Sequence, residues 1–377
     1  MSNYSYKEKT PIQYGEEFID NYLAHHTVEE FEPTGISNYI KGVFMLGIDK
    51  ICRQNKNAEY DKFIKDWLER VLDKDTKMLN RVEGNFWVSL DSLDFRQAGM
   101  LLFRQYEETG DKRYLESINE LCETLFTNYP KTNNGILWHN KQNAPYQVWV
   151  DGLYMAGPIS AQYAKVSGKM EYGHHAVKQA VLMYENLHDE KDGLLFHGWD
   201  ESKEAGWADP ETGLSAEKWG RALGWFVVAC TDMIEYLGED FEGMDKVITY
   251  LKRVFEGLLK VQRKEDGYWT QVIDKPDAEG NWREASCTCL ITYALAKAYR
   301  LGIVGEECIV AARKAFEGVV DSIYIDENGN KVLDEVCIGT CIDDGDYNHY
   351  KNRQKVKNDL HGTGAFLQMC AELNLVD

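Results

Sequence analysis

The sequence predicts an all-α protein in which six helical hairpins form a closed double ring. Amphipathic segments with the 3.6-residue period of an α-helix recur along the chain, and the turns between them repeat in kind. Alternating strand patterns are short and confined to the connections, so a parallel α/β sheet is not supported. An open helical solenoid that serves as a binding scaffold has the same periodicity and stays an alternative.

The helical segments follow one another along the whole chain. A short helix is expected near 14–26. Longer helices are expected near 36–54, 59–74, 93–109, 113–129, 149–168, 169–189, 216–238, 244–262, 284–303, 305–324 and 358–374. No linker rich in Pro or Ser divides them, and only seven Pro occur. Residues 1–377 are therefore expected to form a single domain.

Two kinds of connection alternate between these helices. Short turns run from a Tyr to a Gly, at 106–110, 163–168, 236–238 and 299–302, and lead at once into another helix. Longer connections carry a Gly-centred turn and then an apolar or aromatic run: EGNFW at 83–87, NNGILW at 133–138, KDGLLF at 191–196, EDGYW at 265–269 and ENGNKVL at 327–333. Short turns at one end and long aromatic loops at the other predict that the long loops form the functional face.

The charge of the chain restricts its partners. A formal net charge of -20 argues against nucleic acid and against an anionic membrane surface, because both need a basic face. An acidic small molecule can still bind where a few Arg, His and amide groups meet in one cleft. A monomer or a weak homo-oligomer is expected.

The cysteines and the N-terminus indicate the compartment. Nine Cys is an odd number, and the spacings Cys287-x-Cys289 and Cys337-x3-Cys341 do not match a structural zinc site. Free buried thiols are expected, with no metal. The first residues lack the apolar core of a signal peptide, and no apolar run approaches the ~18 residues of a membrane span. These features favour a cytoplasmic protein, where thiols stay reduced.

Polar and aromatic residues gather where the first helix of several hairpins begins. A rigid helix fixes the side chains at its start, and its dipole favours anions there, so chemistry is expected at these positions. The segments are 89–96, 138–155, 196–202 and 207–225.

Asp94 and Asp151 each open a helix whose remaining residues indicate burial. A single aspartate at such a position usually caps the helix, and capping stays an alternative for both. His139 and His197 lie in equivalent loops. Two aspartates accompanied by these histidines favour a catalytic role, because paired carboxylates in a sugar-binding cleft are typical of glycosidases.

Several Trp lie in the same loops. Trp149, Trp199 and Trp219 adjoin Asp, His or Arg, and a flat ring can cover the apolar face of a pyranose while polar neighbours bind its hydroxyls. Arg221 follows Trp219 by two residues and is suited to bidentate capture of a carboxylate. A surface salt bridge is its alternative role, and Trp225 is expected in the core.

These segments together resemble a known family. The resemblance rests on Tyr39-x-x-Gly42, VWVDGLYMAGP at 148–158, FHGWDES at 196–202, WADPETGLSAEKWGRALGW at 207–225 and NDLHGTGAFL at 358–367. They look like the unsaturated rhamnogalacturonyl hydrolases, glycoside hydrolase family 105, which are related to the unsaturated glucuronyl hydrolases of family 88. The resemblance covers nearly the whole chain and implies an (α/α)6 barrel without metal or organic cofactor.

The resemblance also implies roles. Asp151 would be the general acid/base that protonates C4 of a 4,5-unsaturated uronic acid and helps water to add at C5, which calls for an acid with a raised pKa. Asp94 would be the second essential carboxylate, although Asp91 lies nearby and the family usually has Asn where this chain has Ser92. The residues implied to contact the substrate are Tyr39, His139, Trp149, His197, Trp219 and Arg221.

The implied substrate is a small acidic oligosaccharide derived from rhamnogalacturonan. An unsaturated glucuronyl hydrolase that acts on lyase products of other acidic polysaccharides shares this chemistry and is the nearest alternative. An inverting glycosidase that acts on saturated sugars is a more distant one. The non-enzyme alternative is a helical-repeat binding protein with a concave surface and no closed polar pocket.

Overall fold

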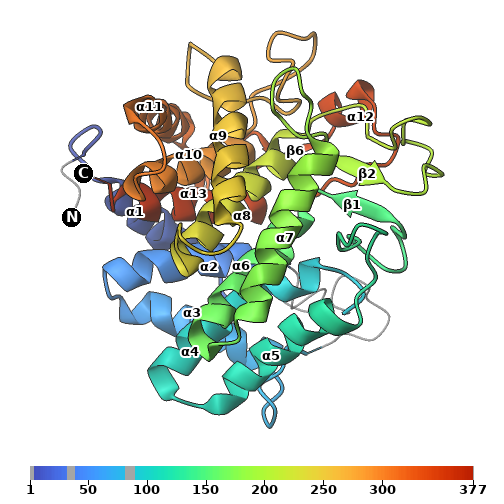
Figure 1. Cartoon of the computed structure of the whole chain (residues 1–377). Helices are drawn as coiled ribbons and strands as arrows, with labels where there is room; N and C mark the ends of the chain where they lie inside the picture. Colours follow the sequence, from blue (N-terminus) through green and yellow to red (C-terminus); the bar gives the residue numbers. More distant parts are fainter. Residues whose placement is uncertain (1–3, 32–38, 81–89, 377) are drawn as a thin grey trace.

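The long helices form two concentric rings. The structure is a computed structural model that describes residues 4–31, 39–80 and 90–376 (Figure 1). The inner ring consists of α2 (Tyr39–Gln54), α4 (Met100–Thr109) with the 3-10 helix η3 (Asp94–Gly99) before it, α6 (Gly152–Ser167), α8 (Gly220–Leu237), α10 (Ala285–Arg300) and α13 (Leu360–Leu373). The outer ring consists of α1 (Pro11–His25), α3 (Ala58–Val71), α5 (Lys112–Thr127), α7 (Met170–Leu187), α9 (Met244–Val261) and α11 (Glu306–Ser322).

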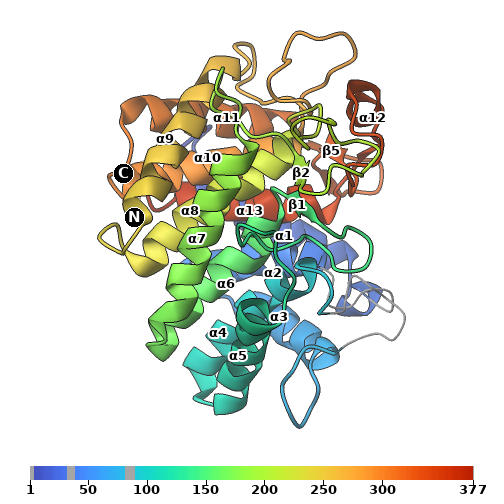
Figure 2. The ribbon, with the colours of Figure 1, turned by 45° about the vertical axis from the view of Figure 1, so that its right-hand side comes forward.

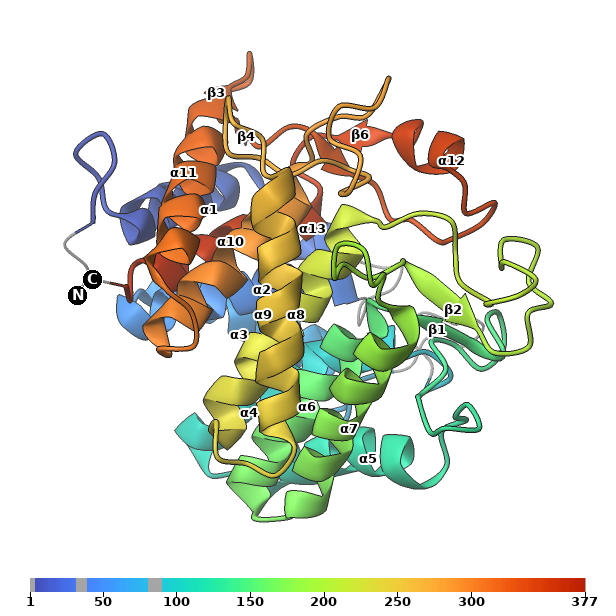
Figure 3. The ribbon, with the colours of Figure 1, turned by 45° about the horizontal axis from the view of Figure 1, so that its top comes forward.

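The inner ring closes on itself. Helix α2 packs on η3, η3 on α6, α6 on α8, α8 on α10, α10 on α13, and α13 back on α2. Each outer helix packs against its inner neighbour, and Figure 3 shows α9 lying across α8. The fold is therefore an (α/α)6 barrel. This confirms the predicted fold class, and a ring that closes is not an open solenoid.

Burial follows this arrangement. In α8 every residue from Gly220 to Ile234 is buried, because neighbours cover the helix on all sides. In α9 the buried residues Val247, Leu251, Val254 and Leu258 recur every three or four positions, and the opposite face meets solvent. The sequence periodicity thus separates inner from outer helices.

The short turns have the predicted chemistry. Gly110 (φ 68°) and Gly168 (φ 77°) end α4 and α6 in the left-handed conformation, which glycine adopts without steric cost. These turns lie at the end of the barrel where the inner helices end. There, Lys297 of α10 pairs with Asp232 of α8 (2.6 Å), and Arg300 pairs with Glu372 of α13 (2.6 Å). Ion pairs between inner helices hold this end.

The long connections lie at the other end and contain short antiparallel pairs. Strand β1 (Gln147–Trp149) pairs with β2 (Gly198–Asp200), β3 (Tyr324–Ile325) with β4 (Lys331–Val332), and β5 (Val336–Cys337) with β6 (Lys355–Val356). Short helices η1 (Val28–Phe31) and α12 (Tyr347–Lys351) complete the described elements. Figure 2 shows β1, β2, β5 and α12 gathered on one side of the helices.

The predicted helix boundaries differ from the structure at a few starts. The helix expected from 149 begins at Gly152, because residues 147–149 pair with β2. The helix expected from 216 begins at Gly220, because Trp219 forms a bridge with Val272. The segment expected from 93 opens as a 3-10 turn, where Arg96 Nη1 donates to the Ser92 carbonyl oxygen (2.6 Å).

Some predictions concern residues outside the ranges that the structure describes. The turn expected at 83–87, residue 89 of the first polar segment and the expected helix start at 36–38 lie outside the described residues. Within the described ranges, no helix combines the length and apolar character needed to cross a membrane. All nine cysteines are free thiols, and all but Cys341 are buried, which confirms that prediction.

Candidate active site

One cavity lies at the starts of the inner helices. It measures about 340 Å³, which is within the usual range of small-molecule pockets. It is lined by Tyr39, Ile40, Asp94, His139, Trp149, Asp151, Met155, Ile338, Gly339, Thr340, Cys341, Asp359 and His361. The helices α2, η3, α6 and α13 contribute their first residues, so segments far apart in sequence form one wall.

Asp151 lies at the start of α6 but does not cap it. Its side chain makes no cap hydrogen bond. Its Oδ2 lies 3.1 Å from His197 Nε2, and His197 Nδ1 lies 2.6 Å from the Tyr350 hydroxyl. Burial alone raises the pKa of the Asp151 carboxyl. The hydrogen bond and charge of His197, with the charge of His139, outweigh burial and hold this pKa below its usual range.

Asp94 has the opposite electrostatic balance. Burial, reinforced by the charge of Asp151, raises the pKa of the Asp94 carboxyl, and only His139 and weaker contacts oppose the shift. Asp94 Oδ1 lies 3.8 Å from His139 Nε2 and Oδ2 lies 3.3 Å from the Ser92 hydroxyl. The pKa values of the two aspartates are therefore shifted in opposite directions, which is the pattern that separates an acid from a base.

Asp91 is not part of the cavity wall. It accepts a hydrogen bond from Gln142 Nε2 (2.7 Å) and pairs with Lys141 (3.3 Å). Asp94, by contrast, lines the cavity. Of the two aspartates left open by the sequence, the structure places only Asp94 beside Asp151.

Trp149 and His139 form an aromatic platform in the cavity. Their rings stack with centroids 4.4 Å apart and planes 14° apart. Trp149 Nε1 donates to Gln147 Oε1 (3.0 Å), which fixes the indole. His139 Nδ1 is buried and has no hydrogen-bond partner among the described residues.

A second chain of hydrogen bonds meets the cavity at the start of α13. Tyr39 Oη lies 2.6 Å from His361 Nε2, and His361 Nδ1 lies 2.5 Å from Asp359 Oδ1. Tyr39 is positioned by α2, which approaches η3 closely at Gly42. A Cβ on Gly42 would lie 2.2 Å from Gln97 Oε1 and 3.0 Å from Ala98 Cα, so the glycine permits this contact.

The expected contact residues are thus divided. Tyr39, His139 and Trp149 line the cavity, whereas His197 lies behind Asp151 with its side chain fully buried. Trp219 and Arg221 are not among the residues that line it, and their contact with substrate stays a prediction. Arg221 is fully buried and donates to the carbonyl oxygens of Cys337 and Ile338 (2.9 Å for the latter). The Arg221 guanidinium also lies 4.4 Å from the Trp219 ring centroid. Through its hydrogen bonds, Arg221 anchors the loop at 338–341.

Sequence reasoning assigned no role to Asp359, His361 or the loop at 338–341. The string at 358–367 was part of the resemblance, and an Asp at the start of an inner helix followed two residues later by His repeats the signal used for Asp94 and Asp151. The sequence therefore contains a signal that could have identified Asp359 and His361. The loop residues carry no comparable signal, because Ile338, Gly339 and Thr340 are ordinary loop residues.

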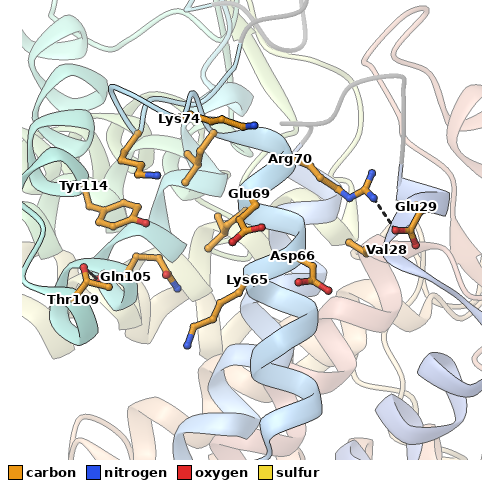
Figure 4. A pocket seen from close by; sticks show the side chains of 13 residues that line it. Val28, Glu29, Lys65, Asp66, Glu69, Arg70, Lys74, Gln105, Thr109 and Tyr114 are labelled. Carbon is orange, nitrogen blue, oxygen red and sulfur yellow. Dashed lines mark hydrogen bonds and ion pairs between the residues drawn. The ribbon is translucent and has the colours of Figure 1, made fainter.

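A larger hollow of about 870 Å³ lies elsewhere, among η1, α3, α4 and α5 (Figure 4). Its wall carries both signs of charge, and part of that charge is neutralised by ion pairs, such as Arg70 with Glu29 (2.7 Å) and Lys65 with Asp61 (2.7 Å). It contains none of the site residues expected from the sequence. The smaller cavity, which contains Asp94 and Asp151, is therefore the candidate active site.

The fold and the cavity together define a glycoside hydrolase built on an (α/α)6 barrel. The chain belongs to Glycosyl Hydrolase Family 88, whose family model matches residues 14–375. A solved family 105 glycoside hydrolase from C. acetobutylicum ATCC 824 is 31% identical, with a TM-score of 0.86, and the match covers 96% of this chain and 99% of that one. This chain is therefore a hydrolase of the family 88 and 105 group.

Some curated relatives have named activities. The unsaturated rhamnogalacturonyl hydrolase YesR of Bacillus subtilis (strain 168) is 24% identical, and the match covers 80% of this chain and 79% of YesR. An unsaturated 3S-rhamnoglycuronyl hydrolase of Alteromonas sp. (strain LOR) is 29% identical over 60% of this chain and 50% of that protein. The predicted family and the predicted enzyme class are confirmed.

Proposed function

We propose that this enzyme removes 4,5-unsaturated galacturonyl residues from the non-reducing end of small oligosaccharides derived from rhamnogalacturonan. The observation that carries the proposal is the pair of buried aspartates, Asp94 and Asp151, in one cavity with pKa shifts of opposite direction. The named activity of the YesR relative supports the choice of substrate.

The reaction is a hydration of a vinyl ether. A proton is added to C4, water supplies a hydroxyl to C5, and the C4=C5 bond is lost. The resulting hemiketal opens by breaking its bond from C5 to the ring oxygen. The hemiacetal left at C1 then breaks down and releases the reducing-side sugar. No carboxylate has to attack the anomeric carbon.

Asp151 serves as the general acid and base in this proposal. The sequence expectation was an acid with a raised pKa, whereas His197 holds the pKa of Asp151 below its usual range in the free enzyme. Binding of the substrate carboxylate raises the pKa of Asp151 to the level that a general acid needs. A negative charge beside Asp151 and the exclusion of water both favour the protonated form, so substrate binding and proton uptake are coupled.

Asp94 is the second essential carboxylate. Because burial raises its pKa, it holds a proton over a wider pH range than Asp151 and can donate a hydrogen bond to the substrate. Trp149 and His139 provide a flat surface for the unsaturated ring. Tyr39 binds the substrate from α2, while His197 acts through Asp151.

The nearest alternative is removal of an unsaturated glucuronyl residue from other lyase products, which the Alteromonas relative favours. Both activities use the same aspartates, so only the substrate distinguishes them. A conventional glycosidase would instead cleave saturated oligosaccharides.

The test is the loss of ultraviolet absorbance of the C4=C5 bond. The substrates are unsaturated disaccharides from rhamnogalacturonan and from ulvan, which is one of the other acidic polysaccharides that lyases cleave. Each is tested with the wild type and with Asp151→Asn. Faster decay on the rhamnogalacturonan product, abolished in the variant, supports the proposal. Faster decay on the ulvan product selects the alternative, and no decay on either contradicts both.

We also propose a cytoplasmic location and a monomer or weak homo-oligomer. The nine free thiols suit a reducing compartment, since buried cysteines without partners are common there. The net charge of -20 keeps copies apart and disfavours nucleic acid and anionic membranes as partners. Cell fractionation and size-exclusion chromatography with light scattering test these statements.

A further inference from the structure

The hydrogen bonds behind Tyr39 fix the direction in which its hydroxyl points. His361 is fully buried between Tyr39 and Asp359, and its two ring nitrogens have one partner each. A carboxylate can only accept, so His361 Nδ1 carries the proton that Asp359 Oδ1 receives. In a neutral ring Nε2 is then an acceptor.

His361 is neutral in this setting. Burial and the nearby Arg221 charge lower the pKa of His361, and they outweigh the opposing effect of Asp359. Burial also raises the pKa of Tyr39 well above its ordinary value, so the phenol keeps its proton. Tyr39 therefore donates its only O–H to His361 Nε2.

We propose that Asp359 and His361 are positioning residues that make Tyr39 a hydrogen-bond acceptor for a ring hydroxyl of the substrate. This inference rests on the proposed function. Because Tyr39 has no proton left to donate, it can accept from a sugar hydroxyl but cannot donate to the uronate carboxylate. The pair therefore sets the orientation of the sugar, with a hydroxyl toward Tyr39 and the carboxylate away from it.

The proposal is specific enough for matched variants. Asp359 is the N-cap of α13, and the same oxygen, Oδ1, accepts from both the His361 backbone N–H and Nδ1. Asp359→Ser keeps a good cap but removes the acceptor from Nδ1. Asp359→Asn keeps both the cap and an acceptor oxygen, so it is the conservative control.

Kinetics test the positioning role. Asp359→Ser and Tyr39→Phe are each expected to raise KM about tenfold with little change in kcat, because one uniform binding contact is lost. Asp359→Asn should stay within about threefold of the wild type, since the acceptor oxygen remains. The Asp359→Ser/Tyr39→Phe double variant should resemble Tyr39→Phe alone, because the two changes remove the same contact. Independent effects that multiply to about a hundredfold would overturn the proposal, as would an unchanged KM in Asp359→Ser.

Nitrogen-15 NMR of the histidine rings tests the same arrangement without relying on activity. The His361 signals, identified by their loss in His361→Gln, should show the Nδ1–H tautomer in the wild type at neutral pH. An Nε2–H tautomer or a doubly protonated ring would overturn the proposal. If the wild type proves inactive on every unsaturated disaccharide, the proposed function fails while the tautomer still decides this inference.

Discussion

His197 lies directly behind Asp151, with its Nε2 3.1 Å from the Asp151 carboxylate and its side chain fully buried. Such a contact controls a carboxyl without touching the substrate. The hydrogen bond and charge from His197 oppose burial, and the balance between them sets when Asp151 holds a proton.

Replacing His197 should therefore change the pH dependence as well as the rate. In His197→Phe, burial is opposed less strongly, because the hydrogen bond and charge of His197 are lost and the weaker effect of His139 remains. The pKa of Asp151 therefore rises, and the carboxyl stays protonated to higher pH. The limb of the kcat/KM profile that reports loss of the Asp151 proton should move upward. The value of kcat should fall about a hundredfold, because the carboxylate that helps water to add loses its orienting partner.

Tyr350→Phe is the matched control for this prediction. It removes the hydroxyl on His197 Nδ1 but leaves the contact between His197 and Asp151. Its profile should stay closer to that of the wild type. A profile of His197→Phe that keeps the wild-type limb would show that His197 does not control Asp151.

Asp94→Asn should lower the activity of the enzyme and raise its free energy of unfolding. An aspartate whose pKa is raised on folding binds its proton more tightly in the folded state, so the free energy of unfolding falls as the pH rises from the unfolded to the folded pKa. Above that range the charged, buried Asp94 carboxylate still lowers the free energy of unfolding, and replacement by the neutral Asn removes this destabilisation. We expect a gain of about 1 kcal/mol at neutral pH and at least about a hundredfold loss of kcat.

Chemical denaturation at two pH values checks the stability of Asp94→Asn. The gain over the wild type should be present at pH 7 and should vanish at pH values where Asp94 is protonated in both states. Asp91→Asn, outside the cavity, is the control and should change neither property much. A variant that is less stable at pH 7 would contradict the pKa direction.

Arg221→Met should act on the loop at 338–341 and on stability. The guanidinium is buried and donates to the carbonyl oxygens of Cys337 and Ile338, and the substitution breaks both hydrogen bonds. The Ile338 oxygen keeps its bond from the Thr340 hydroxyl (2.9 Å), whereas the Cys337 oxygen loses the guanidinium donor. A loss on the order of 3 kcal/mol in the free energy of unfolding is expected, since hydrogen bonds to a buried charge are broken.

Arg353→Met is the control for Arg221. Arg353 also holds this loop, by donating to Thr340 Oγ1 (3.0 Å) and to the Gly339 carbonyl oxygen, but it is partly exposed. Its loss should be well under half of that in Arg221→Met. If Arg221→Met raised KM strongly while the melting temperature stayed unchanged, direct substrate contact would be the better explanation.

Trp149→Ala should weaken substrate binding. The indole stacks on His139 and provides the flat surface for the unsaturated ring. Loss of this surface should raise KM about tenfold or more, while Trp149→Phe should keep part of the binding. Trp199→Ala is the matched control, because Trp199 lies on β2 and does not line the cavity. Equal effects of both alanine variants would contradict the assigned platform.

Local patterns in the amino-acid sequence were enough to identify the helices and the end of the barrel that carries the candidate site. Helical periodicity is local, so α8 and α9 could be recognised as inner and outer helices from their own residues. The glycine turns at Gly110 and Gly168 are equally local. Asp94 and Asp151 followed from their places at helix starts.

Contacts between residues far apart in the chain could be found only from the three-dimensional arrangement of the helices. Tyr39 and His361 are separated by 322 positions, and His197 and Tyr350 by 153, so no local pattern pairs them. The burial of individual side chains, such as that of Arg221, also depends on tertiary packing. Arg221 has the sequence signature of a carboxylate receptor, yet its partners are two backbone carbonyls 116 and 117 positions away. A charged side chain bonds to whatever acceptors the closed ring brings to it, and the closure of the ring depends on contacts between all six hairpins.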